Sequence, residues 1–381
     1  MDCDCDITIV GAGIAGASLA AQLAPQARVA LVEREAQPGQ HSTGRSAAMF
    51  MESYGPPQAR ALTRASRAFY VAPPAGFSDV PLLSPRGVLY VAWNGQQALL
   101  DETASRLSDG GSNVDRRSAA QVLAAVPVLR AAGLLGALAE PDAMDIDVHA
   151  LHQGWLRAAR RAGAALHCGA ELAAATPDGA GWRLTLADGR SWRCTVVVDA
   201  AGAWADEVAT RCGAAALGLQ ARRRSAFTFD APEVSAGVEP RRWPTVAAID
   251  ESWYFKPDAG QLLGSPANAD PVPPHDVVPE EIDVATGIHR IEAHTTLRIR
   301  RPRRAWAGLR TFAPDGELVI GFDHDRRGLF WLAGQGGYGI QSAYGAALLA
   351  AALIDGRALP DELQKQGVVP AAMDPARRLR R

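Results

Sequence analysis

Short apolar runs and small residues alternate at the start of the chain in a pattern typical of a strand, a helix and a second strand. The runs Ile7 to Val10 and Val29 to Val32 have the length and the branched side chains of buried strands. The stretch between them, from about Ala15 to Leu23, is rich in small apolar residues and has the length of one helix. We therefore expect a βαβ unit here.

The turn between the first strand and the helix carries three glycines in the spacing G-x-G-x-x-G. Gly11 permits a tight turn, Gly13 leaves bare backbone for a pyrophosphate, and Gly16 lets the helix pack closely on the strand. The helix N-terminus offers unpaired N–H groups to phosphates. Glu33 follows Gly13 by twenty residues, where a carboxylate accepts ribose hydroxyls and repels a 2′-phosphate. The pattern favours FAD or NAD(H) over NADP, whereas a βαβ unit without a ligand would leave Glu33 unexplained.

Periodicity predicts the elements that follow. A polar loop at 34–48, rich in Gly, Ser and Thr, offers many hydrogen-bond donors. After the capping residue Asp147, we expect a helix that buries Leu151, Trp155 and Leu156. Other expected elements are helices around 66–70, 98–108 and 118–125 and a strand at 88–93.

Residues 164–198 alternate like a β-meander. We expect strands near 165–172, 181–186 and 192–198, with turns at the Asp-Gly pairs 178–179 and 188–189. The last strand leads into an Ala-Ala-Gly turn at 200–202 and a helix, and this small-residue turn lets a flat, bulky group approach the backbone.

From 218 to 312 the pattern is that of antiparallel strands between Pro-rich loops. With a period of two, Phe227 and Phe229 face the core and Arg224 points from the opposite face. Such a sheet, with one polar face beside a cofactor domain, is suited to cover a substrate cavity. The expected strands lie in RRRSAFTF (222–229), PTVAAID (244–250), SWYFKPDAGQLLGS (252–265) and HTTLRIRRP (294–302).

Residues 317–356 predict a β-hairpin, a glycine-rich turn at 334–339 and a final helix with Ala346, Leu349, Ala350 and Leu353 on one side. The turn is a second place where backbone N–H groups can meet an acceptor-rich ligand. One dinucleotide fingerprint together with this distant turn fits FAD bound in an extended form better than a nicotinamide that comes and goes.

Composition narrows the classes of function. The 381 residues suit two domains, and 48% hydrophobic residues, 21% charged residues and a net charge of −2 give no electrostatic case for nucleic acid. The arginine clusters at 222–224 and 298–304 and at the C-terminus are expected to be mainly solvated, Arg222 and Arg223 in particular in surface ion pairs.

The cysteines, the N-terminus and the apolar runs indicate the expected cellular compartment. The five cysteines, at 3, 5, 168, 194 and 212, are spaced for neither zinc nor a disulfide framework, so we expect no metal and a reducing, cytoplasmic compartment. The acidic N-terminus runs directly into the nucleotide-binding pattern, which argues against a cleaved signal peptide. The longest apolar run, near Ala346 to Ile354, is too short to span a membrane.

Six motifs together are specific for a known superfamily. They are GAGIAGAS (11–18), LVEREAQPG (31–39), HSTGRSAA (41–48), VVVDAAGAW (196–204), WAGLRTF (306–312) and GQGGYGIQ (334–341). With them the chain resembles the D-amino-acid oxidase and glycine oxidase superfamily of FAD enzymes. Over nearly its whole length it is similar to the bacterial FAD-dependent D-arginine dehydrogenases.

The resemblance implies a mixed α/β fold with a Rossmann-like FAD-binding domain and an interleaved antiparallel substrate domain. The FAD domain would comprise 1–78, 145–222 and 308–381, and the substrate domain 79–144 and 223–307. The implied reaction is oxidation of a D-amino acid, with a hydride passing from Cα to flavin N5. Water then hydrolyses the imino acid to a 2-oxo acid and ammonia.

The resemblance also implies the cofactor contacts. Some relatives attach FAD through a cysteine near the C-terminus; no cysteine follows Cys212 here, so we expect non-covalent FAD. The implied cofactor residues are Gly11, Gly13, Ala15, Gly16, Glu33, Arg34, Ser42, Thr43, Arg45, Ser46, Ala47, Leu172, Ala201, Gly202, Trp204, Gly336, Gly337, Tyr338, Gly339, Ile340 and Gln341.

The substrate contacts follow from the chemistry of a free amino acid. Its carboxylate in a dry pocket needs a bidentate arginine, and Arg224 and Arg310 match the carboxylate clamps of the family. Tyr254 and Tyr54 match the tyrosines that close the pocket, although core packing is nearly as good an account of Tyr254. Further pocket positions are Met49, Met51, Val88, Thr245, Ala247 and Gly337.

Three departures from the family bear on specificity. Val88 aligns with a glutamate that suits a distal cation in arginine-using relatives, and Met51 replaces a small polar residue. Met49 stands where the family can carry a histidine, so no side-chain base is evident. Because an apolar wall leaves a buried guanidinium unpaired, we expect a preference for neutral or apolar D-amino acids.

Several alternatives stay open. Within the superfamily the chain could be an oxidase of glycine, sarcosine or another secondary amine that produces hydrogen peroxide. Outside it, the chain could be a soluble NAD(H) enzyme or a non-catalytic flavin-binding protein. The expected partners are a small amino acid and an electron acceptor, which could be a quinone, a dye-like acceptor or oxygen.

Overall fold

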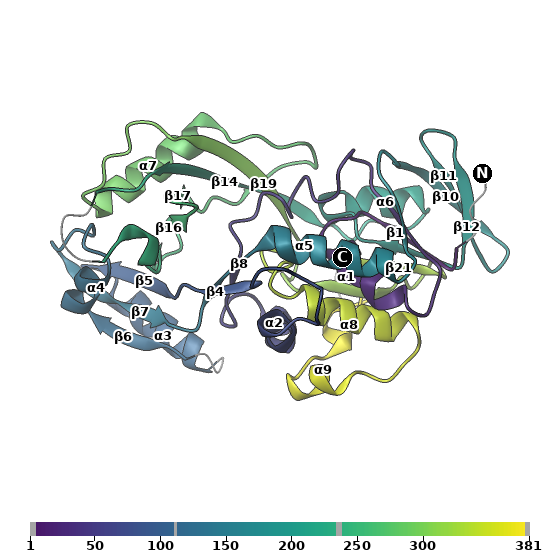
Figure 1. Ribbon diagram of the computed structural model, residues 1–381, viewed down its shortest axis with the longest axis horizontal. Helices are drawn as coiled ribbons and strands as arrows, with labels where there is room; N and C mark the ends of the chain where they lie inside the picture. The colour runs from purple at the N-terminus through teal and green to yellow at the C-terminus, as the bar shows by residue number, and fades with distance from the viewer. Residues whose placement is uncertain (1–4, 110–112, 234–237, 378–381) are drawn as a thin grey trace.

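The chain forms two lobes along the longest axis of the molecule (Figure 1). This computed structural model describes residues 5–109, 113–233 and 238–377. Cys3 and the part of the C-terminal arginine cluster at 378–381 lie outside the described residues.

The first lobe is built around a six-stranded sheet with the predicted βαβ unit at its centre. β1 (Ile7–Val10) pairs in parallel with β2 (Val29–Val32) on one side and with β13 (Val196–Asp199) on the other. Every residue of β1 and β2 is buried, because this sheet is covered on both faces. The outer strands are β9 (Ala165–His167) beside β2, then β21 (Leu329–Ala333) and the antiparallel β20 (Val319–Phe322) beside β13.

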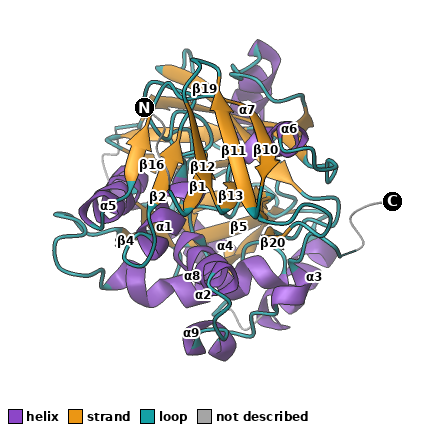
Figure 2. Cartoon of the chain, turned by 90° about the vertical axis from the view of Figure 1, so that its right-hand side faces the viewer, coloured by secondary structure: helices purple, strands orange, loops and turns teal. Residues whose placement is uncertain are grey.

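Helices cover one face of this sheet and a small antiparallel sheet covers the other. Figure 2 shows α1, α2 and α8 gathered on one side of the strands. Four helices cover this face: α1 (Ile14–Leu23), α2 (Pro57–Val71), α5 (Val148–Arg161) and α8 (Ala343–Ile354). The other face is covered by β10 (Leu172–Asp178), β11 (Gly181–Leu186), β12 (Ser191–Cys194) and α6 (Ala205–Arg211).

The predicted start of α5 is confirmed. The Asp147 side chain accepts a hydrogen bond from the Ala150 N–H at 2.8 Å, and Leu151, Trp155 and Leu156 are buried.

The meander expected at 164–198 is wrong in part, because its residues are divided between two sheets. The strand expected at 165–172 is broken at Gly169, whose φ of +59° turns the chain from β9 into β10. The strand expected at 192–198 is broken at Thr195, where the N–H groups of Thr195 and Val196 both donate to the Asp6 carbonyl. Each break lets the chain pass from one layer to the other.

The second lobe is built around a ten-stranded sheet. Along its main path the order is β22-β19-β14-β17-β16-β15-β5-β7-β6, and β18 pairs with β14. The expectation of a wholly antiparallel sheet is wrong at one place, because β15 lies parallel to β5. The strands are β5 (Val88–Trp93), β6 (Asp115–Ser118), β7 (Leu134–Glu140), β14 (Gln220–Asp230), β15 (Thr245–Ala248), β16 (Tyr254–Asp258), β17 (Gln261–Ser265), β18 (Asp270–Pro271), β19 (Arg304–Phe312) and β22 (Gln335–Gly336).

The two faces of this sheet differ, as the alternation of its residues predicts. Phe227, Phe229 and Phe255 pack on one face, together with α4 (Ala119–Ala125) and α7 (Glu281–His294). Arg224 lies one position out of phase with these phenylalanines and therefore projects from the opposite face. The opposite face turns toward the first lobe. Another helix, α3 (Gln97–Asp109), packs beside β5 and β7.

Helix α7 was not predicted, and the strand expected at 294–302 is wrong. The helix ends at His294, and the next strand, β19, begins only at Arg304. Gly287 lies within the helix, and a Cβ there would lie 2.7 Å from the Phe227 ring. Tertiary packing thus requires a residue that helix propensity disfavours.

Arg223 was expected at the surface, but it is only 8% exposed. Its guanidinium pairs with Asp283 at 3.1 Å and with Glu280, which ties α7 to β14. Arg222 is exposed, with its guanidinium over the Phe312 ring.

Three short strands join the lobes: β3 (Met49–Phe50), β4 (Leu83–Pro85) and β8 (Met144–Ile146). β14 and β19 run across the boundaries expected at 222/223 and 307/308, and the division into domains stays a prediction. Short elements complete the fold: η1 (Gly202–Trp204), η2 (Pro240–Arg242), α9 (Asp361–Lys365) and η3 (Pro370–Ala372).

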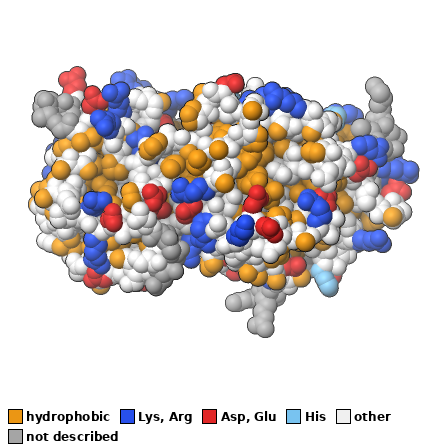
Figure 3. Space-filling view, turned by 60° about the horizontal axis from the view of Figure 1, so that its bottom comes forward, with side chains coloured by type: hydrophobic (Ala, Val, Ile, Leu, Met, Phe, Trp, Pro, Cys, Tyr) orange, Lys and Arg blue, Asp and Glu red, His pale blue; other side chains and the backbone are white. Residues whose placement is uncertain are grey.

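The distribution of charge on the surface and the length of the helices are relevant to binding of polyanions and membranes. On the face shown in Figure 3, basic and acidic side chains are interspersed. Within residues 5–109, 113–233 and 238–377, no helix has both the length and the apolar character needed to cross a membrane.

Candidate cofactor and substrate site

The glycine turn after β1 is shaped by close backbone packing. Gly11 has a φ of +101°, which glycine adopts without strain. A Cβ on Gly16 would lie 1.9 Å from the Gly11 carbonyl oxygen, so only glycine allows the helix to approach the turn. The Ile14 N–H at the start of α1 donates to Thr43 Oγ1 at 3.0 Å, which brings the polar loop 34–48 over the helix N-terminus.

Glu33 lies at the end of β2, at the edge of a cavity. Its Oε2 accepts from the Ala12 N–H and its Oε1 from the Glu35 N–H, each at 3.0 Å. The carboxylate is thereby fixed beside the glycine turn. Each oxygen keeps a lone pair for a further donor, as the predicted ribose contact requires.

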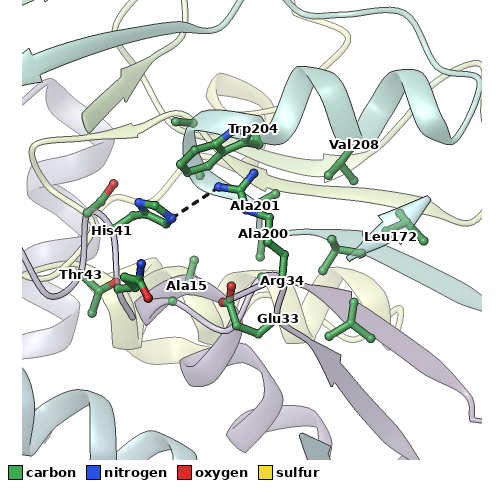
Figure 4. Close-up of a pocket in the computed structure, with 18 of the residues that line it drawn as sticks. Ala15, Glu33, Arg34, His41, Thr43, Leu172, Ala200, Ala201, Trp204 and Val208 are labelled. Carbon is green, nitrogen blue, oxygen red and sulfur yellow. Dashed lines mark hydrogen bonds between the residues drawn. The ribbon is translucent and has the colours of Figure 1, made fainter. Parts of the chain in front are cut away.

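The first cavity extends from this turn to η1 (Figure 4). The Arg34 guanidinium lies 4.0 Å from the centre of the Trp204 ring, and the His41 ring lies 4.6 Å from the same ring. Glu35 accepts from Arg34 at 3.0 Å and pairs with His41 Nε2 at 2.8 Å. Predicted cofactor residues that line this cavity are Gly11, Gly13, Ala15, Glu33, Arg34, Ser42, Thr43, Leu172, Ala201, Gly202 and Trp204.

A second cavity continues from the first toward the polar face of the ten-stranded sheet. The two cavities adjoin and together form one elongated space, because their walls share Ile14, Ala15, Ser42, Thr43, Ala200, Gly202 and Gln335. Predicted residues that line the second part are Ser42, Thr43, Arg45, Ser46, Ala47, Gly202, Arg224, Tyr254, Arg310, Gly336, Gly337, Gly339 and Ile340.

The shape and the donors of this space fit FAD. A glycine turn and a helix N-terminus face one end, and backbone from the second glycine turn faces the other. At the junction, Gln335 Nε2 is buried and has no hydrogen-bond partner in the described part of the chain. A buried amide donor needs an acceptor, and FAD carries many acceptors. Sequence reasoning missed both Gln335 and His41, although each lies inside one of the six motifs.

Three predicted cofactor residues have side chains engaged elsewhere. The Arg45 guanidinium donates to Val277 O at 2.9 Å and pairs with Asp276 at 2.5 Å, and Ser42 Oγ donates to Leu309 O at 2.7 Å. The Gln341 amide accepts from the Met51 N–H at 3.3 Å. It also donates to Tyr54 O at 3.2 Å and to Thr63 Oγ1 at 3.0 Å. Their predicted cofactor contacts therefore concern backbone or aliphatic atoms.

Two guanidinium groups meet at the sheet end of the cavity. Arg310 Nη1 donates to Tyr54 Oη at 3.4 Å, and a Cβ on Gly337 would lie 3.1 Å from the same nitrogen. Arg224 Nε donates to Asn268 O at 2.5 Å. Burial, and after it the charge of Arg310, lowers the pKa of Arg224 to about 10. Both groups are charged at neutral pH, an arrangement that is suited to bind an anion.

Tyrosines border this anion site. The Tyr54 and Tyr338 rings pack edge to face with centroids 5.2 Å apart. Burial, and after it Tyr54, raises the pKa of Tyr338 to about 12, so its phenol stays protonated. The described residues that line the second cavity include no His, Asp or Glu.

Met49, Val88, Thr245 and Ala247, four further residues predicted for the pocket, lie together around β15, but neither they nor Met51 are among the described residues that line the two cavities. Thr245 Oγ1 donates to Met49 Sδ at 3.0 Å, and Thr245 is the strand partner of Val88. Ala247 pairs with Tyr254 on the next strand. Val88 is 2% exposed and lies opposite Glu140 of β7. Sequence reasoning had no signal for Glu140, because the pairing of β5 with β7 brings it there.

Among the residues that the structure describes, no group of three or more His, Cys, Asp or Glu side chains could hold an ion.

Several solved structures share this fold. Glycine oxidase from Geobacillus kaustophilus is 24% identical, with a TM-score of 0.83 over 98% of this chain and 99% of that one. L-proline dehydrogenase from P. horikoshii is 18% identical, with a TM-score of 0.82 over 99% and 98%. L-α-glycerophosphate oxidase from Mycoplasma pneumoniae, solved with FAD bound, is 17% identical, with a TM-score of 0.82 over 92% and 95%.

The family model described as "DAO: FAD dependent oxidoreductase" matches residues 6–353, which include the glycine turn, the polar loop, both arginines and the second glycine turn. The mixed α/β fold and FAD as cofactor are confirmed by this match and by the shared fold. The chain belongs to the DAO family of FAD-dependent oxidoreductases.

Proposed function

We propose that the protein is an FAD-dependent D-amino-acid dehydrogenase that binds the substrate carboxylate between Arg224 and Arg310. The observation that carries the proposal is the pair of guanidinium groups at one end of the cavity, with Tyr54 bonded to one of them. Several proteins with this fold bear the names of enzymes that act on amino acids, among them glycine oxidase and L-amino acid deaminase. The expected products are a 2-oxo acid and ammonia.

The side chains of the cavity act mainly by positioning. Two guanidinium groups anchor the carboxylate, and Tyr54 and Tyr254 limit its movement, which fixes the direction of the Cα–H bond. FAD, when bound, supplies the acceptor for two electrons. With no side-chain base in the wall, the substrate amine releases its proton to solvent before oxidation. We infer that FAD is held non-covalently, because the described residues that line both cavities include no cysteine.

Anaerobic mixing with single amino acids tests this function. We expect the flavin absorbance to be bleached by D-amino acids and not by their L-enantiomers. Bleaching by L-amino acids alone, or by none of a broad panel, would contradict the proposal. Turnover with a quinone or dye compared with peroxide release in air then separates a dehydrogenase from an amine oxidase.

The charge of Arg224 predicts a pH dependence. Because its pKa is lowered to about 10, the guanidinium is charged below that pH and loses its charge above it. The affinity for a small carboxylate such as pyruvate should be constant at neutral pH and fall about tenfold per pH unit above about 10. Titration of the flavin spectrum with pyruvate measures it. In Arg224→Met the affinity for pyruvate should be lower and should no longer fall above pH 10. If the affinity of the variant still falls there, a group other than Arg224 titrates.

We propose further that the substrate side chain extends toward Val88, Met49 and Met51, and that neutral or apolar substrates are preferred because these residues offer no charge to a cation. Glu140 lies opposite Val88, so a second acid at 88 would face a like charge. The informative variant is therefore Val88→Glu with Glu140→Gln. Its ratio of kcat/KM for D-arginine over D-leucine should rise about tenfold or more, the effect of a charged hydrogen bond of about 1.5 kcal/mol. Val88→Gln with Glu140→Gln is the control for the added charge. If the ratio in Val88→Glu with Glu140→Gln is unchanged from the wild type, Val88 does not contact the substrate side chain.

A further inference from the structure

Glu140 is a buried acid for which the proposed reaction has no use. It ends β7 on the face of the sheet that turns toward the first lobe, and it is 4% exposed. Ser53 Oγ donates to Glu140 Oε2 at 2.6 Å, and Ser53 is itself 3% exposed. A buried carboxyl is costly unless it is hydrogen-bonded, so this bond helps to hold the Ser53 segment in place, as does a side-chain hydrogen bond between Ser53 and the buried Tyr90.

The Ser53 segment is held from the opposite side as well. Gln341 follows the second glycine turn; its Oε1 accepts from the Met51 N–H at 3.3 Å and its Nε2 donates to Tyr54 O at 3.2 Å. Residues 51–54 are therefore fixed by Gln341 from the first lobe and by Glu140 from the second.

Tyr54 lies between these two attachments. Its hydroxyl accepts from Arg310 Nη1 at 3.4 Å, and its ring packs on Tyr338. Gly55, with a φ of +106°, follows directly, and a Cβ there would lie 2.9 Å from the Tyr338 ring. Because consecutive Cα atoms are about 3.8 Å apart, a shift of Ser53 is passed to Tyr54.

We propose that Glu140 is a positioning residue that acts through Ser53 to hold Tyr54 against Arg310, and thereby sets the affinity of the cavity for the substrate carboxylate. This role rests on the proposed function only in that the ligand is a carboxylate. Glu140 itself does not contact the substrate.

Variants of the two bonded residues test the inference in the FAD-loaded protein. Glu140→Leu and Ser53→Ala remove the bond, and Glu140→Gln keeps an acceptor for Ser53. Glu52→Gln is the matched control, because Glu52 lies in the same segment but pairs with Arg67 at 2.7 Å. Ser53→Ala introduces no new bulk and keeps the test usable if Glu140→Leu does not fold.

The first measurement is the dissociation constant of pyruvate, from its effect on the flavin spectrum. Glu140→Leu and Ser53→Ala should each weaken binding about tenfold, with FAD content unchanged, and the double variant should bind no more weakly than either single one. Glu140→Gln should restore most of the affinity and Glu52→Gln should match the wild type. With a D-amino acid, KM should rise in the same proportion, and any fall in kcat should be smaller than the rise in KM, because the weakened contact is with the carboxylate and not with the reacting Cα–H bond. Additive effects or wild-type affinity in Ser53→Ala would overturn the inference.

The second measurement is amide hydrogen exchange over residues 49–56, which needs neither turnover nor a ligand. Exchange should become faster in Ser53→Ala and Glu140→Leu and stay unchanged in Glu52→Gln, and unchanged exchange in all variants would overturn the inference. If no amino acid reduces the flavin, the proposed function fails, whereas pyruvate binding and exchange still decide the role of Glu140.

Discussion

Replacement of Arg310 by Met should raise KM for the amino acid by about two to three orders of magnitude while the FAD content stays unchanged. Truncating one partner of a buried charge pair costs about 2 to 5 kcal/mol, because the other charge is left without its counterpart. Arg310 lies at the sheet end of the cavity beside Gly337, away from the glycine turn that faces the dinucleotide. Steady-state kinetics and the ratio of flavin to protein absorbance measure the two quantities.

The matched control is Arg222→Met. Arg222 is the strand partner of Arg310 on β14, but its guanidinium lies over the Phe312 ring at the surface. The control should leave KM within about twofold of the wild type, since isolated surface arginines contribute little. Equal kinetics in both variants would exclude Arg310 from carboxylate binding.

The second large effect is expected at the glycine turn. In Gly16→Ala the new Cβ would meet the Gly11 carbonyl oxygen at 1.9 Å, so α1 must move away from the turn. Overpacking of this kind costs about 1 to 3 kcal/mol or more, and we expect a lower melting temperature together with loss of FAD.

Gly13→Ala separates cofactor binding from folding. Its φ of −68° suits any residue, and the new Cβ would meet only Thr43 Oγ1, at 3.2 Å. The apoprotein should melt within a few degrees of the wild type, whereas the FAD dissociation constant should rise at least about tenfold, equivalent to about 1.4 kcal/mol. Fluorescence titration of apoprotein with FAD measures it. If Gly13→Ala binds FAD with the affinity of the wild type, the pyrophosphate does not lie against Gly13.

The sequence predicted those parts of the fold that depend on local chemistry. The βαβ unit, the Asp147 cap and the C-terminal hairpin and helix are confirmed, because apolar periodicity, capping and glycine turns act over a few residues. The parallel pairing of β15 with β5 and the helix α7 were not predicted. The first joins strands far apart in the chain, and the second contains Gly287 for the sake of the Phe227 ring.

The sequence predicted some residues of the candidate site and missed others, for the same reason. The glycine motifs and the alternation around Arg224 pointed to residues that the structure brings to one cavity, although their roles stay predictions. Gln335 and Glu140 were missed, because one is distinguished only by an unpaired buried amide and the other only by the strand opposite Val88. Neither property is visible in local sequence.

The long strands β14 and β19 connect the interiors of both lobes. Phe227 of β14 lies in the apolar core of the second lobe, while Ala221 and Leu309 near their other ends pack against Ala203 of the first. Their nine consecutive paired positions resist bending, so these two described strands do not form a flexible hinge of the kind that clamshell enzymes use to enclose a ligand. We expect a ligand to enter and leave through displacement of short surface loops, with the distance between the lobe centres constant throughout the catalytic cycle.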